Sequence, residues 1–314
     1  MSPIKMKTTR REHLSTIGAA IVLPTIAELL HASDASTRRH PHIATNTYPW
    51  LTFARRKNQT LELHTDQLLA DIATTGITGY EPIISETKEF DGLAQRLKKH
   101  HLEMRSIYVN STLHDKWKVD SSIDKVIRIA KSASRIGTKI VVTNPSPIRW
   151  GGPEDKNDSE LRLQARSLDR LGAALRKIGI TLAYHNHDAE LRQGGREFHH
   201  MLTATSPENV KLCLDAHWVY RGCGDSEVAV FDALEHYHER IVELHLRQSS
   251  GGVWTEAFSM SGDIDYTQMF KFLSEANLAP HLVLEQAVES KSKETETAID
   301  AHRASCKCLA GHFT

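Results

Sequence analysis

Residues 121–144, SSIDKVIRIAKSASRIGTKIVVTN, contain the helix–glycine–strand unit whose repetition decides the predicted fold. In residues 121–136 the apolar side chains recur every three or four positions, which indicates an amphipathic helix. Gly137 follows this run, where a residue with positive φ commonly ends a helix, and a short β-rich run, residues 139–143, comes next. The same junction recurs at Gly76 and Gly179, so the sequence predicts a repeated β/α unit.

Alternating strands and helices continue from about residue 43 to the end of the chain. The predicted strands are residues 43–49, 77–83, 102–109, 139–143, 180–184, 210–214, 241–246 and 281–284. The predicted helices are residues 65–75, 90–100, 121–136, 159–178, 197–205, 227–238, 265–276 and 294–309. This pattern predicts a parallel sheet of the α/β class that closes into a (β/α)8 TIM barrel. An open doubly wound sheet is the competing fold, but the first strand lacks a Gly-x-Gly-x-x-Gly phosphate turn after it.

Length and charge limit the domain organisation and the kind of partner. The 314 residues suit one barrel, and we predict a single catalytic domain over residues 42–314. Lys plus Arg and Asp plus Glu both number 39, so no net charge attracts nucleic acid or an anionic membrane. We therefore expect a small, sugar-like substrate and no nucleic acid. The four cysteines form no Cys-x-x-Cys pair, and we assign them no chemical role.

The first 38 residues are predicted to be an export signal and linker. Arg10 and Arg11 precede a small and apolar run, residues 15–30, which resembles a twin-arginine signal. A proline and a glutamate interrupt the run, and it is shorter than the roughly 20 residues that span a bilayer. We expect a periplasmic or extracellular protein whose mature part has no membrane span. The alternative is a disordered basic N-terminus on a cytoplasmic protein.

Polar side chains follow nearly every predicted strand, at the end of the barrel where such folds carry their active sites. They include Glu81, Asn144, His185, His187, Asp215, His217, His245, Arg247 and Glu285. A single histidine such as His245 would be read as a packed core imidazole. Strands five to eight, however, end in His185, Asp215, His245 and Glu285. Because buried carboxylates are costly unless paired or metal-bound, this set predicts one divalent ion, Mn²⁺ by preference, with Mg²⁺, Co²⁺ or Zn²⁺ as alternatives.

Five segments resemble the sugar phosphate isomerase/epimerase family of xylose-isomerase-like barrels. They are LAYHNHDAE (182–190), LCLDAHW (212–218), LHLR (244–247), GDIDY (262–266) and LEQ (284–286). The resemblance implies a metal set of Glu, Asp, His and Glu, whose two glutamates also move protons. Asp215, His245 and Glu285 match that set, but His185 stands where the first glutamate is expected. His185 can still bind the ion, or Glu190 can replace the missing carboxylate, and the Tyr-His-Asn-His pattern is closest to inosose dehydratase-like members.

This resemblance implies removal of a proton beside a polarised carbonyl of a keto-sugar, keto-inositol or keto-glycoside, through an enediolate. We predict Glu285 as the base, with its pKa raised toward neutrality by apolar surroundings, and His187 and His185 as further catalytic residues. The predicted substrate-binding residues are Glu81, Asn144, Glu190, His217, Arg247 and Glu256, and Trp150, Trp218 and Trp254 could stack on a ring. Elimination, as in a dehydratase or lyase, is preferred over the reprotonation of a ketose isomerase or 3-epimerase.

Two other classes of function compete with this interpretation. A non-catalytic sugar-binding barrel is suggested by the histidine at position 185. An endonuclease IV-like DNA repair nuclease would need further metal ligands and a basic groove for phosphates. The balanced charge and the predicted export signal both argue against a nuclease.

Overall fold

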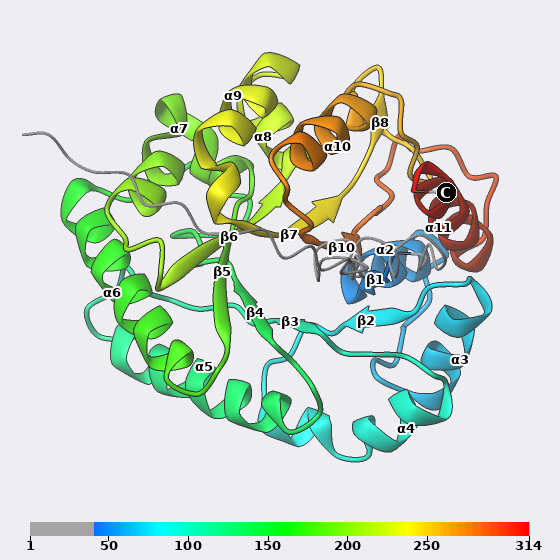
Figure 1. Ribbon diagram of the computed structural model, residues 1–314, viewed down its shortest axis with the longest axis horizontal. Coiled ribbons are helices and arrows are strands. Elements are labelled where there is room, and N and C mark those ends of the chain that lie inside the picture. The colour runs from blue at the N-terminus through cyan, green and yellow to red at the C-terminus, as the bar shows by residue number, and fades with distance from the viewer. Residues whose placement is uncertain (1–40, 314) are drawn as a thin grey trace, which may run out of the picture. The chain divides into compact units, whose positions relative to one another are not determined.

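The computed structural model describes residues 41–313, and the predicted export signal and linker lie outside the described residues. Eight parallel strands form one sheet, in the order β2-β1-β10-β7-β6-β5-β4-β3 (Figure 1). Their bounds are β1 Ile43–Asn46, β2 Gly79–Glu81, β3 Ser106–Tyr108, β4 Ile140–Thr143, β5 Thr181–His185, β6 Val210–Asp215, β7 Ile241–Leu246 and β10 His281–Leu284. These strands correspond one by one to the eight that the sequence predicted.

The two outer strands of this order, β2 and β3, close the sheet on itself. Isolated parallel bridges join Gly79 to Glu103 and Ile83 to Tyr108. The backbone N–H of Tyr80 donates to the carbonyl of Glu103 at 2.9 Å. The fold is therefore the (β/α)8 TIM barrel that the sequence predicted.

Helices surround the strands as an outer ring (Figure 1). Those predicted are α3 Asp66–Thr74, α4 Leu93–Lys99, α5 Val119–Ser134, α6 Asp158–Arg176, α7 Asp188–Thr203, α9 Glu227–Tyr237, α10 Tyr266–Glu275 and α11 Ala298–His312. The range of α7 contains non-helical residues at 192–195, so its regular part corresponds to the predicted helix 197–205. Gly76, Gly137 and Gly179 all have positive φ, as expected from residues that end helices without strain.

Two short helices, α2 Thr47–Arg56 and α8 Ala216–Gly222, were not predicted. Each begins directly after a strand, where the last strand residue also caps the helix. The side chain of Asn46 accepts a hydrogen bond from the Tyr48 N–H, and that of Asp215 accepts one from the Trp218 N–H. Pro49 is tolerated in α2 because it lies in the first turn, where its missing N–H has no helical partner. The predicted strand 43–49 was therefore too long.

A short antiparallel hairpin and two 3₁₀ turns complete the chain. The hairpin consists of β8 Ser249–Ser250 and β9 Val253–Trp254, and it follows β7. The 3₁₀ turns are η1 Thr87–Phe90 and η2 His238–Arg240. With α2 and α8, the hairpin adds chain to the end of the barrel at which the strands terminate.

The barrel wall separates an apolar layer from a polar interior. Alternate residues of a strand point to opposite faces, so Leu244 and Leu246 pack against helices while His245 points into the barrel. Tyr108, Val142, Ala183 and Cys213 form a small separate cluster in the middle of the barrel.

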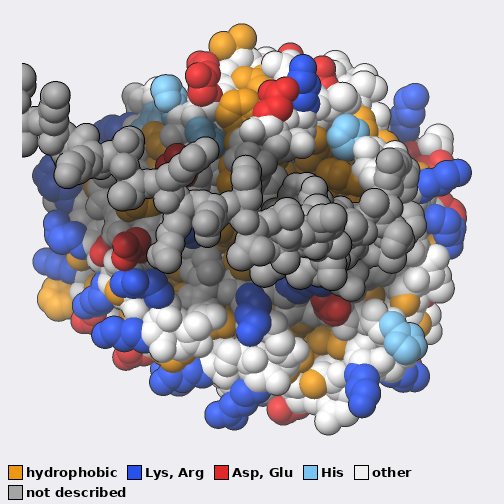
Figure 2. All heavy atoms as spheres, viewed as in Figure 1, with side chains coloured by type: hydrophobic (Ala, Val, Ile, Leu, Met, Phe, Trp, Pro, Cys, Tyr) orange, Lys and Arg blue, Asp and Glu red, His pale blue; other side chains and the backbone are white. Residues whose placement is uncertain are grey.

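On the face shown in Figure 2, Lys and Arg side chains are interspersed with Asp and Glu side chains around the periphery. Between residues 41 and 313, no helix is long and apolar enough to cross a membrane.

Candidate active site and metal centre

Four side chains predicted as metal ligands meet at one end of the barrel. They come from the ends of β5, β6, β7 and β10, which are neighbours in the sheet. The four residues are His185, Asp215, His245 and Glu285. Each offers a ligand atom, these atoms lie within 4.8 Å of one another, and all four residues are buried. The structure thus brings the predicted set together, and its binding of an ion stays a prediction.

Unpaired buried atoms in this group fit a divalent cation. Both ring nitrogens of His185 and the Oδ2 atom of Asp215 are buried without a hydrogen-bond partner among residues 41–313. Burial lowers the pKa of His185 well below its usual value, so the ring is neutral and keeps a lone pair for a ligand bond. Because buried polar atoms are normally paired, such lone pairs suit imidazole and carboxylate coordination of one ion.

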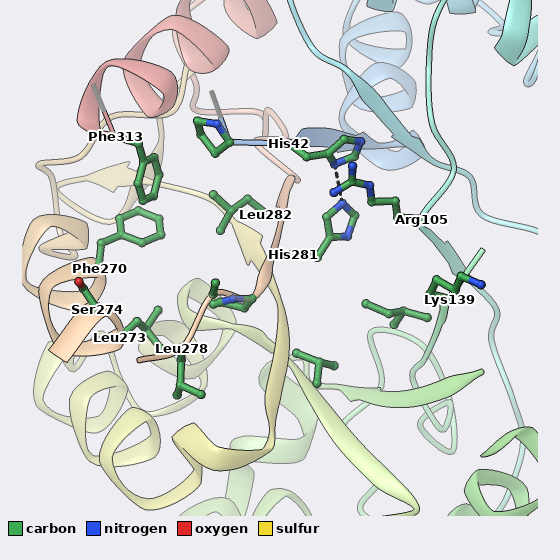
Figure 3. A pocket seen from close by; sticks show the side chains of 15 residues that line it. His42, Arg105, Lys139, Phe270, Leu273, Ser274, Leu278, His281, Leu282 and Phe313 are labelled. Carbon is green, nitrogen blue, oxygen red and sulfur yellow. Dashed lines mark hydrogen bonds between the residues drawn. The ribbon is translucent and has the colours of Figure 1, made fainter. Parts of the chain in front are cut away.

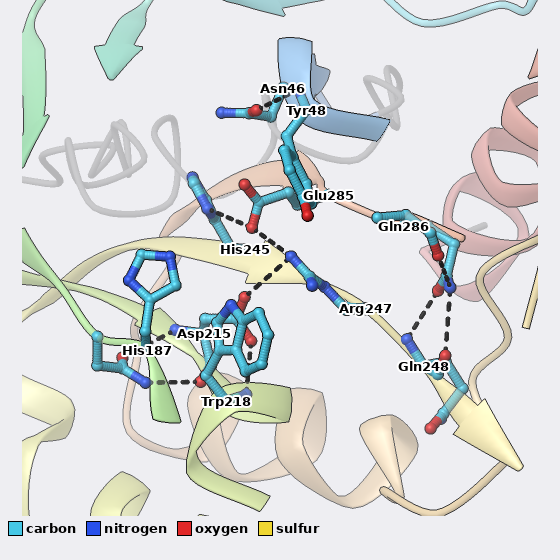
Figure 4. Close-up of polar contacts among 12 residues, drawn as sticks. Asn46, Tyr48, His187, Asp215, Trp218, His245, Arg247, Gln248, Glu285 and Gln286 are labelled. Atoms are coloured by element: carbon cyan, nitrogen blue, oxygen red, sulfur yellow. Dashed lines mark hydrogen bonds and ion pairs between the residues drawn. The ribbon is translucent and has the colours of Figure 1, made fainter. Parts of the chain in front are cut away.

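Arg247 lies against the same carboxylates. Its NH2 group donates to Glu285 Oε2 at 2.7 Å and lies 3.7 Å from Asp215 Oδ2 (Figure 4). The guanidinium carbon lies 4.9 Å from the ring centroid of Trp218 and 4.3 Å from that of Trp254. Its Nε and NH1 groups have no partner among the described residues, so they can donate to substrate oxygens.

The charges set the protonation of the two acidic ligands. Burial raises the pKa of Asp215 to about 6, although Arg247 opposes this rise. Burial also tends to raise the pKa of Glu285, but His245 and Arg247 outweigh that effect and hold the pKa below its ordinary value. The expected rise of the Glu285 pKa toward neutrality is therefore wrong. Its physical reason is the two neighbouring cationic groups, which the sequence did not place beside it.

His245 is held between the site and a second layer of carboxylates. Its Nδ1 atom lies 3.2 Å from Glu285 Oε2, on the side of the site. Its Nε2 atom lies 3.0 Å from Glu81 Oε2 and 3.4 Å from Glu243 Oε1. Asn46 donates to Glu81 Oε2 at 2.6 Å, and burial raises the pKa of Glu81 to about 7. The fully buried Glu81, predicted to bind substrate, therefore contacts a metal-ligand candidate instead, and such contacts orient an imidazole.

Two residues of this layer, Glu243 and Cys213, were missed by the sequence analysis. Glu243 also contacts His281, with its Oε2 atom 2.9 Å from the Nδ1 atom, and the Cys213 thiol lies 3.6 Å from Glu243 Oε1. Each stands two positions before a predicted ligand, His245 or Asp215. Strand alternation places such residues on the same inward face, and this signal was available in the sequence.

Two other sets of neighbouring residues could also hold a metal ion. One consists of His185, Cys213 and His245, and the other of Glu81, Glu243 and His245. Glu285 lines an open cavity, whereas Glu81 and Glu243 are fully buried. The four-residue group therefore borders the cavity through Glu285, and we take it as the candidate metal centre.

Asn144 and Glu190 have structural partners close to the site. Asn144 Nδ2 donates to the His185 carbonyl at 3.0 Å and lies 3.2 Å from Glu190 Oε1. Glu190 Oε2 accepts from the backbone N–H of His187 at 2.7 Å, at the start of α7. Both carboxylate oxygens of Glu190 are thus engaged, and the groups that could hold an ion do not include it. Glu190 is therefore not brought to the position of the missing glutamate.

The other predicted residues divide between the cavity and the outer loops. His187 lines the cavity, and burial lowers its pKa to about 4, so the ring is neutral at pH 7. The His217 Nε2 atom lies 2.8 Å from Ser249 Oγ, and this residue is absent from the cavity lining. Glu256 accepts from Arg56 at 2.7 Å and holds the loop at residues 295–296, away from the four ligands. The structure thus places His187 beside the site and gives His217 and Glu256 other partners.

The cavity above the four ligands has a volume of about 340 Å³. Its lining includes Tyr48, Tyr108, Trp150, His187, Trp218, Arg247 and Glu285. Figure 4 shows His187, Trp218, Arg247 and Glu285 close together at this end of the barrel. A few charged groups among aromatic rings, in a cavity of this size, are typical of a small-molecule site.

The opposite end of the barrel carries another cavity, of about 590 Å³. Its lining includes His42, Arg105, Lys139 and His281, at or just before the starts of strands (Figure 3). The Nδ1 atom of His42 lies 3.2 Å from His281 Nε2, and burial lowers the pKa of His42 to about 4. Because this end of a (β/α)8 barrel serves stability, the candidate active site is at the other end.

Comparison with known proteins identifies the family that the sequence segments resemble. The model of a family described as xylose isomerase-like TIM barrel matches residues 69–309. The chain belongs to this family. The resemblance to sugar isomerases and epimerases that the sequence suggested is therefore confirmed.

Similar proteins include one sequence relative and two solved structures that share the fold. An inosose dehydratase of Clostridium perfringens is 25% identical over 248 residues, which cover 70% of this chain and 81% of that protein. A sugar phosphate isomerase/epimerase structure from Parabacteroides distasonis has a TM-score of 0.68 at 18% identity, and covers 89% of this chain and 96% of its own. A 3-keto-D-glucoside 4-epimerase from E. coli has a TM-score of 0.60 at 15% identity, with 87% and 98% covered.

Proposed function

We propose that the chain is a metal-dependent enzyme that removes a proton beside the carbonyl of a keto-sugar, keto-inositol or keto-glycoside. Elimination, as in a dehydratase or lyase, is the preferred outcome, and reprotonation to an isomer or epimer is the alternative. The convergence of four buried ligand groups beside an aromatic cavity is the observation that carries this proposal. Residues 42–314 would form the catalytic domain, and export of the protein stays a prediction.

His185, Asp215, His245 and Glu285 would hold the ion, with Mn²⁺ favoured. A bound divalent ion would supply Lewis-acid polarisation of a carbonyl. Arg247 would orient the substrate, because its Nε and NH1 groups are unpaired and its guanidinium is fixed against Trp218 and Trp254.

Glu285 is the proposed base. Its low pKa keeps the carboxylate ionised at neutral pH, so it can accept a proton. Arg247 and His245 both contact its Oε2 atom. Its Oε1 atom has no hydrogen bond to another residue of the described chain and is therefore available to take the proton from the carbon beside the carbonyl.

His187 is the proposed proton donor to a departing oxygen. Its neutral ring lines the same cavity, with its centroid 5.2 Å from that of Trp150 and 5.6 Å from that of Trp218. In the elimination, the C–H bond gives its proton to Glu285 and the bond to the β-oxygen breaks. The N–H of the neutral His187 ring donates to that oxygen, and the proton taken up by Glu285 returns through solvent, so that the oxygen leaves protonated and both side chains are restored. Reprotonation on the opposite face would call on a second carboxylate, and position 185 carries histidine instead. This difference supports elimination.

A screen of keto-sugars, keto-inositols and 3-keto-glycosides with Mn²⁺, read by mass spectrometry, tests the proposal. Loss of water or of an aglycone identifies elimination, and an unchanged mass with a new retention time identifies isomerisation. Incorporation of solvent deuterium at the carbon beside the carbonyl tests the proton-removal step. The absence of turnover of every compound, with each of the four candidate ions, would refute the enzymatic proposal.

The Glu285→Gln variant tests the base. We expect kcat to fall by at least about a hundredfold, the size of a general-base contribution, while the circular dichroism spectrum stays that of the folded parent. Glu62→Gln is a matched control, because Glu62 is exposed. Normal turnover by Glu285→Gln would exclude Glu285 as the base.

A non-catalytic sugar-binding barrel is the second candidate, and the histidine at position 185 favours it. Calorimetry with the same compounds separates the two candidates. Binding of a keto-sugar without any change of mass or retention time would identify the binding protein.

A further inference from the structure

A second cavity opens beside the proposed active site and shares two of its walls. Its volume is about 590 Å³. Tyr48 and Trp218 line both this cavity and the smaller one beside Glu285. The Arg247 guanidinium lies over both rings, 5.9 Å from the Tyr48 centroid and 4.9 Å from the Trp218 centroid (Figure 4). Neighbouring cavities with common aromatic walls can hold two linked parts of one ligand.

The walls of the second cavity come from chain that is added to the basic β/α repeat. Tyr48, Thr52 and Arg55 of α2 line it, at spacings of four and three residues that place them on one face of the helix. Trp218 and Arg221 of α8 line it with a spacing of three residues. Arg56 at the end of α2, the hairpin and the loop after β10 supply the rest. All four segments follow strand ends, so the second cavity opens at the catalytic end of the barrel.

The lining combines aromatic rings with polar side chains. Val288 is its one aliphatic member, whereas Thr52 and Ser290 are hydroxyl residues. Arg55 is exposed, and its guanidinium has no hydrogen bond or ion pair to another residue between 41 and 313. The indole N–H of Trp254 is buried without a partner in the same part of the chain. Such unpaired donors suit the hydroxyl oxygens of a ligand, and aromatic rings suit its less polar face.

Most of the charge around the second cavity is already neutralised. Arg221 forms a bidentate pair with Glu289, at 3.0 and 2.7 Å. Arg56 pairs with Glu256 at 2.7 Å. A neutral, hydroxylated ligand therefore fits this lining better than a hydrocarbon or a multiply charged anion.

We infer that the second cavity binds a second sugar ring, and that the substrate is a keto-sugar joined to another sugar by a glycosidic bond. This inference rests on the proposed function and specifies its substrate. The keto-sugar ring occupies the cavity beside Glu285, and the second ring lies beyond Tyr48 and Trp218. An aromatic aglycone in place of the second sugar would leave the unpaired polar groups of the lining without partners.

Two variants change the second cavity without touching the candidate metal ligands. Ser290→Trp places a bulky side chain in the cavity, and Ser290 is exposed, so the substitution disturbs no core packing. Arg55→Ala removes the unpaired guanidinium. Arg128→Ala is the control, because Arg128 is also an exposed arginine and lies on α5, outside this cavity. Melting temperatures establish that all three variants fold.

The probes are 3-ketoglucose, 3-ketocellobiose and phenyl 3-ketoglucoside. Affinities are measured by calorimetry without added Mn²⁺, and kcat/KM with Mn²⁺. We expect the parent to favour the keto-disaccharide over the keto-monosaccharide by about tenfold, the ratio that corresponds to about 1.4 kcal/mol. Ser290→Trp should reduce this ratio to about one, Arg55→Ala should lower it, and Arg128→Ala should keep it.

If 3-ketoglucose and 3-ketocellobiose have equal affinities and equal kcat/KM values, with the parent and with Ser290→Trp, the second subsite is overturned and the proposed function stays intact. Phenyl 3-ketoglucoside bound as tightly as 3-ketocellobiose would overturn the assignment of a sugar. If none of the three compounds is bound or converted while another keto-sugar or keto-inositol of the screen is turned over, this inference fails and the proposed function stands. If no compound of that screen is turned over, both fail.

Discussion

Replacement of Asp215 by asparagine should separate its proposed role as a metal ligand from its role in the fold. One oxygen, Oδ1, accepts a hydrogen bond from the Trp218 N–H at 2.9 Å and caps α8. The other, Oδ2, is buried, has no hydrogen-bond partner within residues 41–313, and lies 3.7 Å from the NH2 group of Arg247. Because asparagine is as good an N-cap as aspartate, the variant keeps the cap and loses the anionic ligand, together with the ion pair to Arg247.

The expected size of the effect follows from linkage between binding and folding. For the parent, an ion at a hundred times its Kd stabilises the fold by about 2.7 kcal/mol. In a domain of this size that corresponds to a rise in melting temperature of roughly 5–10 °C. If loss of the carboxylate weakens binding about a hundredfold, the same ion concentration contributes only about 0.4 kcal/mol, or roughly 1 °C.

The assay is thermal unfolding of EDTA-treated protein, followed by circular dichroism, with and without MnCl₂. Asp265→Asn is the matched control, because Asp265 caps α10 with its side chain in the same way and lies outside the candidate metal groups. The control should show the full shift of the parent. A full shift in Asp215→Asn would refute Asp215 as a ligand, and a parent that no divalent ion stabilises would refute the metal site.

Three further substitutions test contacts of the fold and the site. Arg247→Gln should bind Mn²⁺ at least about tenfold more tightly in calorimetry, because the guanidinium competes for Glu285 and repels the ion. His302, stacked on Trp50, is buried, and burial lowers its pKa to about 4. The ring is neutral in the folded protein, whereas in the unfolded chain it takes up a proton below about pH 6.5. The free energy of unfolding is therefore not affected by His302 above pH 6.5, and falls by about 3 kcal/mol as the pH is lowered to 4. Urea unfolding of His302→Leu should show a correspondingly weaker dependence on pH over that range. Gly172→Ala should lower the free energy of unfolding by about 1–3 kcal/mol, because its Cβ would lie 2.0 Å from the Asn209 carbonyl oxygen.

For each of these three predictions, one result would contradict the reasoning. Weaker Mn²⁺ binding by Arg247→Gln would show that the guanidinium supports the site and does not compete with the ion. Identical pH profiles for the parent and His302→Leu would exclude His302 as a source of acid sensitivity. An unchanged free energy of unfolding for Gly172→Ala would show that α6 moves away from Asn209 at no cost.

Local sequence patterns were sufficient for the barrel and for its set of ligand residues. Helical periodicity, glycines after helices and β-rich runs identified the eight strands because these signals depend on neighbouring residues. The last residues of consecutive strands then pointed to His185, Asp215, His245 and Glu285, because parallel strands bring their ends to one side.

The same patterns were insufficient where one residue serves two elements. Asn46 and Asp215 end strands and also cap α2 and α8, but the local pattern at these positions predicted only the strand. The missed helices supply several walls of the second cavity, so the proposed disaccharide subsite could not be inferred from the sequence.

The sequence alone determined which residues stand at the mouth of the barrel, whereas the partners of each side chain were decided by the tertiary structure. Glu81 and Glu190 both looked like substrate ligands, yet Glu81 contacts His245 and Glu190 contacts Asn144 and the His187 backbone. The pKa of Glu285 falls below its ordinary value for the same reason, because Arg247 and His245 lie beside it. Strand register and side-chain rotamers set such contacts between residues far apart in the chain, and a local pattern contains neither.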